Sequence, residues 1–394
     1  MTFCRRPGSD DETQMRILLT SPTYPPFNSG LGNALAQQAA CLARARHEVV
    51  VATGGAQRGS REVEGIRVET FALTGADCWL QPIRGDVAAY TDFLLHNDWD
   101  VVLLNAWQNW ATDLALRHLK KIPGRKFVYS HCISTNVFYP HQPIRSLARY
   151  LAWRPYWYRM THVLRKLDGV IFLANDGSDS RFDDFRRALE VGANYYVVPN
   201  ALSPAAVKAV TRPPLTLFER DRLIAVGSYH WQKGFDFVLR AYASSRACNQ
   251  ISLHFFGQEC SDFSKQLHRQ AKALGIYPDY IFFHTGVSGD ALQAEYNQAR
   301  LVLSGSHTEC QPLALLDASA SATPFVARTT GCIDGMPGGV TIKNWDEMAL
   351  QIDEFSENID RWRRYSQAAR SAAVTIYHPD VVTQQLITVL EGNA

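Results

Sequence analysis

The sequence predicts an α/β protein with two doubly wound domains that face each other across a cleft. Short apolar, β-branched runs alternate with helix-compatible segments along the whole chain, and this alternation is typical of parallel sheets built from βαβ units. Nearly all of the runs lack alternating polar residues, so we expect helices on both faces of each sheet. The length of 394 residues also exceeds what one hydrophobic core usually supports.

The first domain is predicted to span residues 15–204, after a disordered tail over residues 1–14. Its expected strands are the apolar runs at residues 16–21, 48–53, 66–71, 100–105, 126–131, 169–174 and 195–199. Helix-compatible segments separate them, which favours a parallel sheet.

The second domain is predicted to span residues 205–375. The proline- and charge-rich stretch "SPAAVKAVTRPPLTLFERD", residues 203–221, is interpreted as the linker to it. Its expected strands are residues 222–227, 251–256, 280–284, 300–305, 324–327 and 339–342. Because open α/β sheets bind ligands beyond the carboxyl ends of their strands, two facing sheets should place the site in the cleft between them.

Composition excludes several classes of function. With 40 basic and 38 acidic residues the net charge is only +2, so no overall field favours nucleic acid as a partner. The 8 cysteines include no CxxC pair, which fits neither a zinc site nor a disulfide framework and favours a reducing cytoplasm. The polar N-terminus has no apolar signal, and no run is long enough to span a bilayer.

Two glycine-containing loops follow predicted first strands. Gly30 and Gly32 come after residues 16–21 and open a helix, where backbone amides and the positive helix end could hold a phosphate. A plain tight turn explains these glycines equally well. Lys233 and Gly234 follow residues 222–227; this lysine could balance a diphosphate, or it could be an ordinary solvated loop lysine.

The stretch "ECQPLALLD" combines a helix start with two carboxylates. Pro312 suits the first turn of a helix, because its missing N–H costs nothing there. The amides of Leu313 and Ala314 would then be donors for a phosphate. Glu309 precedes them and Asp317 follows within the helix, so both carboxylates could accept hydrogen bonds from sugar hydroxyls. Alternatively, Glu309 only stabilises the helix start and Asp317 is a surface residue.

These segments together resemble the family 4 retaining glycosyltransferases. "TSPTYPPFNSGLGNALAQQAACLARARHEVVVAT" resembles the family's first strand, glycine loop and second strand, with Arg46 where glycine is usual. "VVPNAL" resembles the segment that closes the first domain, "VGSYHWQKG" is similar to "VGRLxxxKG", and "ECQPLALLD" matches E-x7-E. The resemblance covers residues 15 to about 390 and implies two Rossmann-like domains of the B-type glycosyltransferase fold.

The resemblance also implies roles for individual residues. Glu309 would face the donor sugar, Asp317 the ribose, and His131 the reacting carbon, while Lys233 would contact the diphosphate. The segment 376–394 would form a helix that crosses back onto the first domain. Asp317 is one methylene shorter than the usual glutamate. Ser228 stands where an arginine normally assists Lys233, so His230 or Arg328 would have to replace that cation.

The function predicted is metal-independent transfer of a sugar from a nucleotide-diphosphate sugar to a hydroxyl acceptor, with retention of configuration and no cofactor. The alternatives are a non-catalytic nucleotide-sugar-binding scaffold, favoured by Ser228, and a two-domain phosphorylase or epimerase. Residues near which the acceptor could bind are Tyr24, Asn28, Trp107 and Asn136.

The basic and aromatic stretch at residues 149–167 has two interpretations. It could lie on anionic lipids, which would place the protein at the inner face of the membrane. The favoured interpretation is a buried helix, with Pro155 interrupting the pattern. The sequence does not indicate an oligomeric state.

Overall fold

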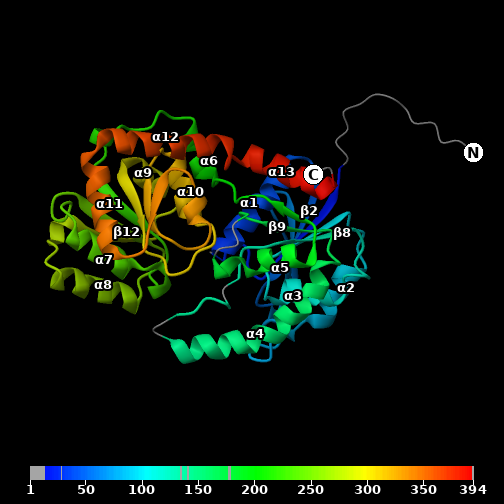
Figure 1. Ribbon diagram of the computed structural model, residues 1–394. Coiled ribbons are helices and arrows are strands. Elements are labelled where there is room, and N and C mark those ends of the chain that lie inside the picture. Colours follow the sequence, from blue (N-terminus) through cyan, green and yellow to red (C-terminus); the bar gives the residue numbers. More distant parts are fainter. Residues whose placement is uncertain (1–13, 28, 134, 140–141, 176–178, 393–394) are drawn as a thin grey trace, which may run out of the picture. The chain divides into compact units, whose positions relative to one another are not determined.

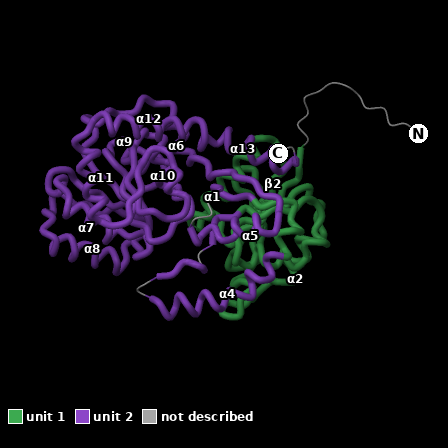
Figure 2. The backbone as a smooth tube through the Cα atoms, viewed as in Figure 1, with its two compact units in different colours: residues 1–129, 162–170 green, residues 130–161, 171–394 purple. Residues whose placement is uncertain are grey.

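A computed structural model describes residues 14–27, 29–133, 135–139, 142–175 and 179–392. The chain forms two compact units, residues 1–129 with 162–170, and residues 130–161 with 171–394 (Figure 2). The predicted tail, residues 1–14, lies outside the described residues except for its last residue.

One sheet has eight strands in the order β10-β9-β8-β7-β1-β2-β4-β3 (Figure 1). The pairs β1–β2, β1–β7, β2–β4 and β7–β8 are parallel, and β3–β4 is antiparallel. β7 and β9 are buried along their whole length, as expected for strands covered on both faces. The strands are β1 (Arg16–Ser21), β2 (Glu48–Gly54), β3 (Gly59–Val63), β4 (Ile66–Phe71), β7 (Val101–Asn105), β8 (Arg125–Tyr129), β9 (Gly169–Phe172) and β10 (Tyr195–Val197).

The elements between these strands are mainly helices. They are α1 (Gly30–Arg44), the short pair β5 (Leu73–Thr74) and β6 (Arg84–Gly85), α2 (Val87–Leu95), α3 (Trp110–Arg117), α4 (Pro143–Leu164), the 3-10 turn η1 (Ser180–Phe182) and α5 (Asp183–Val191). Gly192 has a left-handed φ of 64° and ends α5, the conformation that favours glycine after a helix.

A second sheet has six strands in the order β13-β12-β11-β14-β15-β16, and all of its pairs are parallel. Its strands are β11 (Arg222–Val226), β12 (Ser252–Gly257), β13 (Ile281–Thr285), β14 (Ala299–Ser304), β15 (Phe325–Arg328) and β16 (Gly339–Ile342). Leu223, Leu253, Phe255, Leu303 and Val326 from these strands form part of one buried core.

The helices of the second sheet form two packed groups. α7 contacts α8 and α11, whereas α10 contacts α6, α9 and α12, which agrees with helices on both faces of the sheet (Figure 1). The helices after residue 203 are α6 (Pro204–Val210), α7 (Phe235–Ser244), α8 (Asp262–Ala273), α9 (Gly289–Gln298), α10 (Leu313–Ala320), α11 (Trp345–Glu357), α12 (Ile359–Thr375) and α13 (Pro379–Glu391), with 3-10 turns η2 (Leu217–Glu219), η3 (Trp231–Lys233), η4 (Pro278–Tyr280) and η5 (Ile333–Gly335).

Three sequence predictions of secondary structure were wrong in part. β3 was missed because it is an exposed strand without an apolar pattern. The predicted linker contains α6, whose start the sequence does signal, since Ser203 accepts a hydrogen bond from Ala206 and Pro204 occupies the first turn. α10 begins at Leu313, so Pro312 is its extended N-cap and not part of its first turn.

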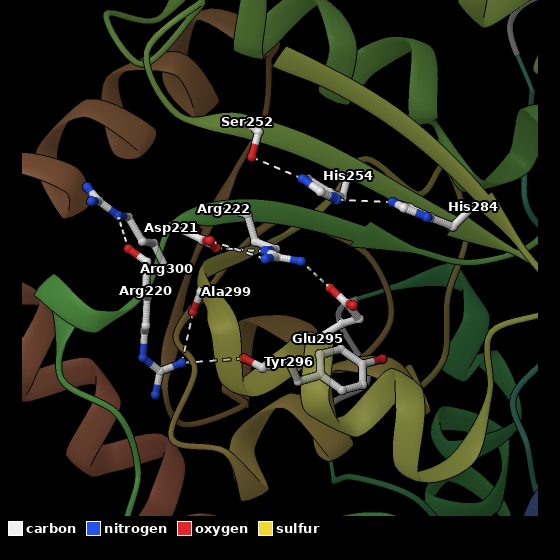
Figure 3. A network of polar contacts seen from close by, with 10 residues as sticks. All are labelled: Arg220, Asp221, Arg222, Ser252, His254, His284, Glu295, Tyr296, Ala299 and Arg300. Atoms are coloured by element: carbon white, nitrogen blue, oxygen red, sulfur yellow. Dashed lines mark hydrogen bonds and ion pairs between the residues drawn. The ribbon is translucent and has the colours of Figure 1, made fainter. Parts of the chain in front are cut away.

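A buried arginine fixes the segment that precedes the second sheet. Arg220 is 1% exposed, and its guanidinium donates to the carbonyl oxygens of Leu215, Tyr296, Ala299 and Ser321 and to Thr323 Oγ1. Burial lowers its pKa to about 10, so it stays charged at neutral pH. Figure 3 shows it beside the Arg222–Glu295 ion pair and the His254–His284 contact. Because Arg222 begins β11, the contacts of Arg220 and Arg222 lie at the amino end of that strand, whereas His284 aligns with the carboxyl end of β11.

No helix within the described part of the chain is long and apolar enough to cross a membrane. The predicted domain boundary near residue 204 lies between β10 of the first sheet and β11 of the second. The division into domains stays a prediction.

Candidate functional site

The candidate site lies in the second unit, where the loops that follow β11 and β14 meet. Lys233 Nζ is 2.5 Å from Glu309 Oε1, and their side chains are 33% and 14% exposed. Ser306 Oγ donates to the same carboxylate oxygen at 2.9 Å. The structure therefore brings together two of the residues that the sequence predicted for donor binding.

Close contact between two glycines brings the loops together. A Cβ added to Gly234, which has a φ of 61°, would lie 1.9 Å from the carbonyl oxygen of Gly305. A Cβ added to Gly305 would lie 2.3 Å from the carbonyl oxygen of Gly234. Only glycine at both positions allows this approach, and the approach places Lys233 opposite Glu309.

A third loop, after β15, supports the backbone of Glu309. The Glu309 amide donates to Thr330 Oγ1 at 3.3 Å. A Cβ added to Gly331 would lie 2.4 Å from the carbonyl oxygens of both Glu309 and Cys310. The side chain of Glu309 is thus positioned by loops at the carboxyl ends of β11, β14 and β15, as expected for an open parallel sheet.

The start of α10 offers backbone donors next to Glu309. The amides of Leu313 and Ala314 lie in the first turn and have no partner within the helix, and none of the described residues accepts a hydrogen bond from them. Asp317, one turn further, accepts from the Ser203 amide at 2.9 Å. Burial raises the Asp317 pKa to about 6, although the hydrogen bonds from Ser203 oppose this.

Arg181 is a second cation at Glu309 that sequence reasoning missed. Its Nη1 donates to Thr308 Oγ1 at 2.5 Å, while its buried Nε has no acceptor among the described residues. Burial lowers the Arg181 pKa, and the charge of Glu309 is the strongest of those that oppose this. Asp179 holds this segment in place, because its carboxylate accepts from the amides of Arg181 and Gly331 at 2.8 and 2.7 Å.

The prediction that the cysteines form no disulfide was wrong. Cys132 and Cys310 are joined, with their Cα atoms 5.9 Å apart. These cysteines directly follow His131 and Glu309, so the bond connects the loop of the predicted histidine to the loop of the predicted carboxylate. Cys132 has a left-handed φ of 64°, which is uncommon for a residue with a side chain.

His131 lies two residues beyond the end of β8, and not within the strand as predicted. Burial lowers its pKa to about 4, so the imidazole is neutral at pH 7. The neighbouring Ser130 donates to Asp184, which is fully buried.

The two predicted glycine-loop positions differ. Gly32 is tightly packed, because an added Cβ would lie 3.0 Å from Ser29 Oγ, and its amide already donates to that hydroxyl at 2.9 Å. Gly30 is the first residue of α1, and an added Cβ would meet nothing within 4 Å. Of the two, Gly30 is the better candidate for contact with an anion.

The residues proposed to compensate for the missing arginine have other contacts. Ser228 itself is exposed. Arg328 Nη1 lies 2.9 Å from His307 Nδ1 and its guanidinium stacks over Phe237. His230 is exposed and caps the turn η3 that carries Lys233. Neither side chain contacts Lys233 or Glu309 through any hydrogen bond or ion pair that the structure records.

The predicted acceptor residues are mostly not available for stacking. Tyr24 and Trp107 are 5% and 4% exposed, which favours a core role for both. Asn136 is partly buried and donates to Asp183. Asn28 lies outside the described residues. No group of three or more metal-ligating side chains occurs among the residues that the structure describes.

Residues 220–358, which carry the Lys233–Glu309 pair, match the family model described as glycosyl transferases group 1. This segment of the chain is similar to that family. The glycine contact that positions Lys233 and the start of α10 both lie inside the matched segment. No curated protein matches the chain in sequence.

Solved structures match nearly the whole chain at low identity. Sucrose-phosphate synthase from Thermosynechococcus elongatus aligns with a TM-score of 0.73 and 15% identity over 96% of this chain and 99% of that one. Trehalose 6-phosphate synthase from Burkholderia multivorans gives 0.67 and 13% over 96% and 99%. HepE from Anabaena, solved with UDP-glucose, gives 0.66 and 16% over 96% and 100%.

These matches confirm the predicted fold class, two Rossmann-like domains of the B-type glycosyltransferase fold. The family model over residues 220–358 confirms the resemblance to glycosyltransferases that the sequence predicted. The roles of the individual site residues stay predictions.

Proposed function

We propose that the chain is a retaining glycosyltransferase that moves a sugar from a nucleotide-diphosphate sugar to a hydroxyl acceptor. The observation that carries this proposal is the Lys233–Glu309 pair beside the unpartnered amides of Leu313 and Ala314, within the segment that matches the glycosyl transferases group 1 family model. A cation, two amides and a carboxylate are the groups that a nucleotide sugar needs, for its diphosphate and its hydroxyls.

Each group has a distinct role in the proposal. The helix-start amides and Lys233 hold the diphosphate, and Glu309 accepts a hydrogen bond from a hydroxyl of the donor sugar. Because Lys233 and Glu309 neutralise each other across 2.5 Å, binding would exchange this contact for one between Lys233 and the diphosphate. Asp317 would accept from the ribose with the oxygen that does not bind Ser203.

The reaction breaks the bond between the anomeric carbon and the diphosphate oxygen. The acceptor oxygen forms its bond on the same face of the sugar, and its proton goes to the departing phosphate. The difficult step is the development of charge on the diphosphate, and preorganised donors aimed at that charge accelerate it. His131, neutral at pH 7 because of its lowered pKa, would orient the donor at the reacting carbon.

The similar structures support a uridine nucleotide as the first donor to test, since HepE was solved with UDP-glucose. Neither the sugar nor the acceptor of this chain follows from that similarity. We expect no cofactor and no metal requirement. A cytoplasmic location and the boundaries at residues 15–204, 205–375 and 376–394 belong to the same proposal, as does the return of α13 to the first domain.

Ligand binding followed by product analysis tests the proposal. A panel of nucleoside diphosphates and nucleotide sugars should include at least one that raises the melting temperature, since a ligand that binds only the folded state stabilises it. The matching nucleotide sugar, incubated with candidate acceptors and chelator, should give a glycoside with the donor's anomeric configuration. No stabilisation by any nucleotide at millimolar concentration would contradict the proposal.

The scaffold alternative has one observation in its favour, the exposed serine at position 228 in place of a cation. It predicts nucleotide binding without hydrolysis or transfer. A product that remains a nucleotide sugar, or a requirement for free phosphate, would instead indicate an epimerase or a phosphorylase.

A further inference from the structure

Helix α4, residues Pro143–Leu164, has two apolar faces, and only one of them is buried. Trp153, Tyr156, Trp157 and Met160 are 2–4% exposed. The predicted burial therefore holds for one face of the helix only, and Pro155 lies inside the helix without ending it. The other face carries apolar side chains that point into solvent.

The exposed apolar residues form one stripe. Ile144, Leu147, Leu151 and Tyr158 are 82%, 54%, 58% and 76% exposed. They occupy positions i, i+3, i+7 and i+14, which fall on one side of a helix with about 3.6 residues per turn. The buried aromatic residues fall on the opposite side. Phe138, in the segment before α4, is a further exposed apolar residue at 59%.

Arginines lie on both sides of this stripe. At about 100° per residue, Arg154 falls on one side of the stripe and Arg145 and Arg159 fall on the other. All three are exposed, and Arg165 and Lys166 follow directly after the helix. No Asp or Glu occurs anywhere in residues 114–167. An exposed apolar stripe between cations, without any carboxylate, matches the interfacial region of an anionic bilayer.

We propose that α4 binds the surface of a membrane that contains anionic phospholipids. The stripe enters the boundary between headgroups and acyl chains, and the flanking arginines contact the phosphates. Arginine side chains extend their apolar stems along the helix while their charged ends reach the headgroups. The stripe contains neither Lys233 nor Glu309, so this proposal does not depend on the proposed reaction.

Charge and apolarity together favour a lipid surface over two other occupants. Nucleic acid would use the arginines but would not require four exposed apolar side chains in a row. A second copy of the chain would bring a second set of arginines to the same stripe. A bilayer with anionic lipids satisfies both features, and α4 then lies in the interface without crossing it.

Co-sedimentation with vesicles tests the proposal. The full chain should pellet with vesicles that contain phosphatidylglycerol, much less with phosphatidylcholine alone, and less as salt increases. Ile144→Ser, Leu147→Ser and Leu151→Ser should each lower the partition coefficient about tenfold. The matched control is Leu350→Ser, because Leu350 on α11 is 63% exposed and should have no effect.

A second readout does not depend on sedimentation. Leu151→Trp should add a component to the fluorescence that shifts to the blue with phosphatidylglycerol vesicles, whereas Leu350→Trp should not. Arg145→Gln, Arg154→Gln and Arg159→Gln combined should weaken binding and reduce its dependence on salt. Unchanged melting temperatures would show that these exposed substitutions leave the fold intact.

Three results would overturn the proposal. The first is absence of binding to anionic vesicles at low salt. The second is vesicle binding that the serine substitutions do not alter. Displacement of the protein from the vesicles by RNA, equally for the native chain and the serine variants, would have the same meaning. The third is a dimer of the native chain that the serine substitutions dissociate, which would identify a second copy as the occupant.

Discussion

Lys233 is the residue whose charge matters most in the proposed reaction, because Ser228 leaves it without the usual neighbouring cation. Its ion pair with Glu309 is only partly exposed, so each charge has the other as its nearest counter-ion. Arg181, bound to Thr308, brings a further positive charge to Glu309. The negative charge of the Glu309 carboxylate is therefore still compensated when the Lys233 side chain binds a ligand.

Lys233→Met should lower turnover at least about a hundredfold, since removal of one preorganised charge-stabilising group has effects of this size. Binding of the nucleoside diphosphate should weaken between about tenfold and a hundredfold. Glu309→Gln should lower turnover while nucleoside diphosphate binding is kept. Steady-state kinetics and calorimetry measure these effects, with Lys265→Met as the control at an exposed lysine on α8. Full turnover by Lys233→Met would remove the lysine from the mechanism.

The His254–His284 contact gives the molecule a predictable response to acid. Burial is the main cause that lowers the His254 pKa to about 4, with Arg222 and His284 adding to it and Asp221 opposing it; burial also lowers the His284 pKa. An unfolded chain binds protons at these histidines near the ordinary pKa of about 6.5, but the folded chain does not. Stability from this pair is therefore complete above about pH 6.5 and is lost as the pH falls toward 4.

His254→Gln should flatten the fall in melting temperature between pH 6.5 and 4. The substitution removes a side chain that binds a proton at a higher pH in the unfolded chain than in the folded chain. His96→Gln is the control, because the side chain of His96, which directly follows α2, is 72% exposed. Calorimetric scans across this pH range make the comparison, and parallel curves for His254→Gln and the native chain would contradict the assignment.

At the scale of the elements, the site depends on the close contact between the loop that contains Gly234 and the loop that contains Gly305. Gly305→Ala should destabilise the chain by about 1–3 kcal/mol, because the added methyl would lie 2.3 Å from a backbone oxygen. The loop shift should also separate Lys233 from Glu309 and weaken nucleoside diphosphate binding. Gly335→Ala is the matched control, since its added methyl meets nothing within 4 Å. Equal stability of the two variants in urea would show that the loops do not need this contact.

Strands and site differed in how well the sequence predicted them. The apolar runs predicted β1, β4 and β16 with their observed bounds. The signal is clearest for β1, because a strand buried along nearly its whole length needs apolar residues throughout. Lys233 and Glu309 were found from local patterns at strand ends. Arg181 could not be found in that way, since its contact with Thr308 spans 127 residues. β3 was not predicted because it carries no apolar pattern. The exact start of α10 was not predicted because Pro312 is compatible with both the N-cap and the first turn of a helix.

For the whole molecule, the disulfide between Cys132 and Cys310 closes a loop with a sequence separation of 178 residues. In the chain-entropy view, a loop of this length restricts the unfolded state by about 5 kcal/mol. A thiol reductant should therefore lower the free energy of unfolding, and Cys132→Ser should give the same loss without further response to reductant. Cys260→Ser, at an exposed free thiol, is the control. Identical urea curves with and without reductant would show that the bond is absent in solution.

The same bond also sets an order of events during synthesis. At about 5–20 residues per second, Cys132 leaves the ribosome roughly ten to thirty seconds before Cys310, which lies 178 residues later. During that interval Cys132 can meet only earlier or intervening thiols, such as Cys41, Cys78, Cys248 and Cys260. Correct pairing therefore has to wait until translation has passed β14. Expression in a strongly oxidising compartment would trap wrong pairs, whereas oxidation after release would find the two cysteines already side by side.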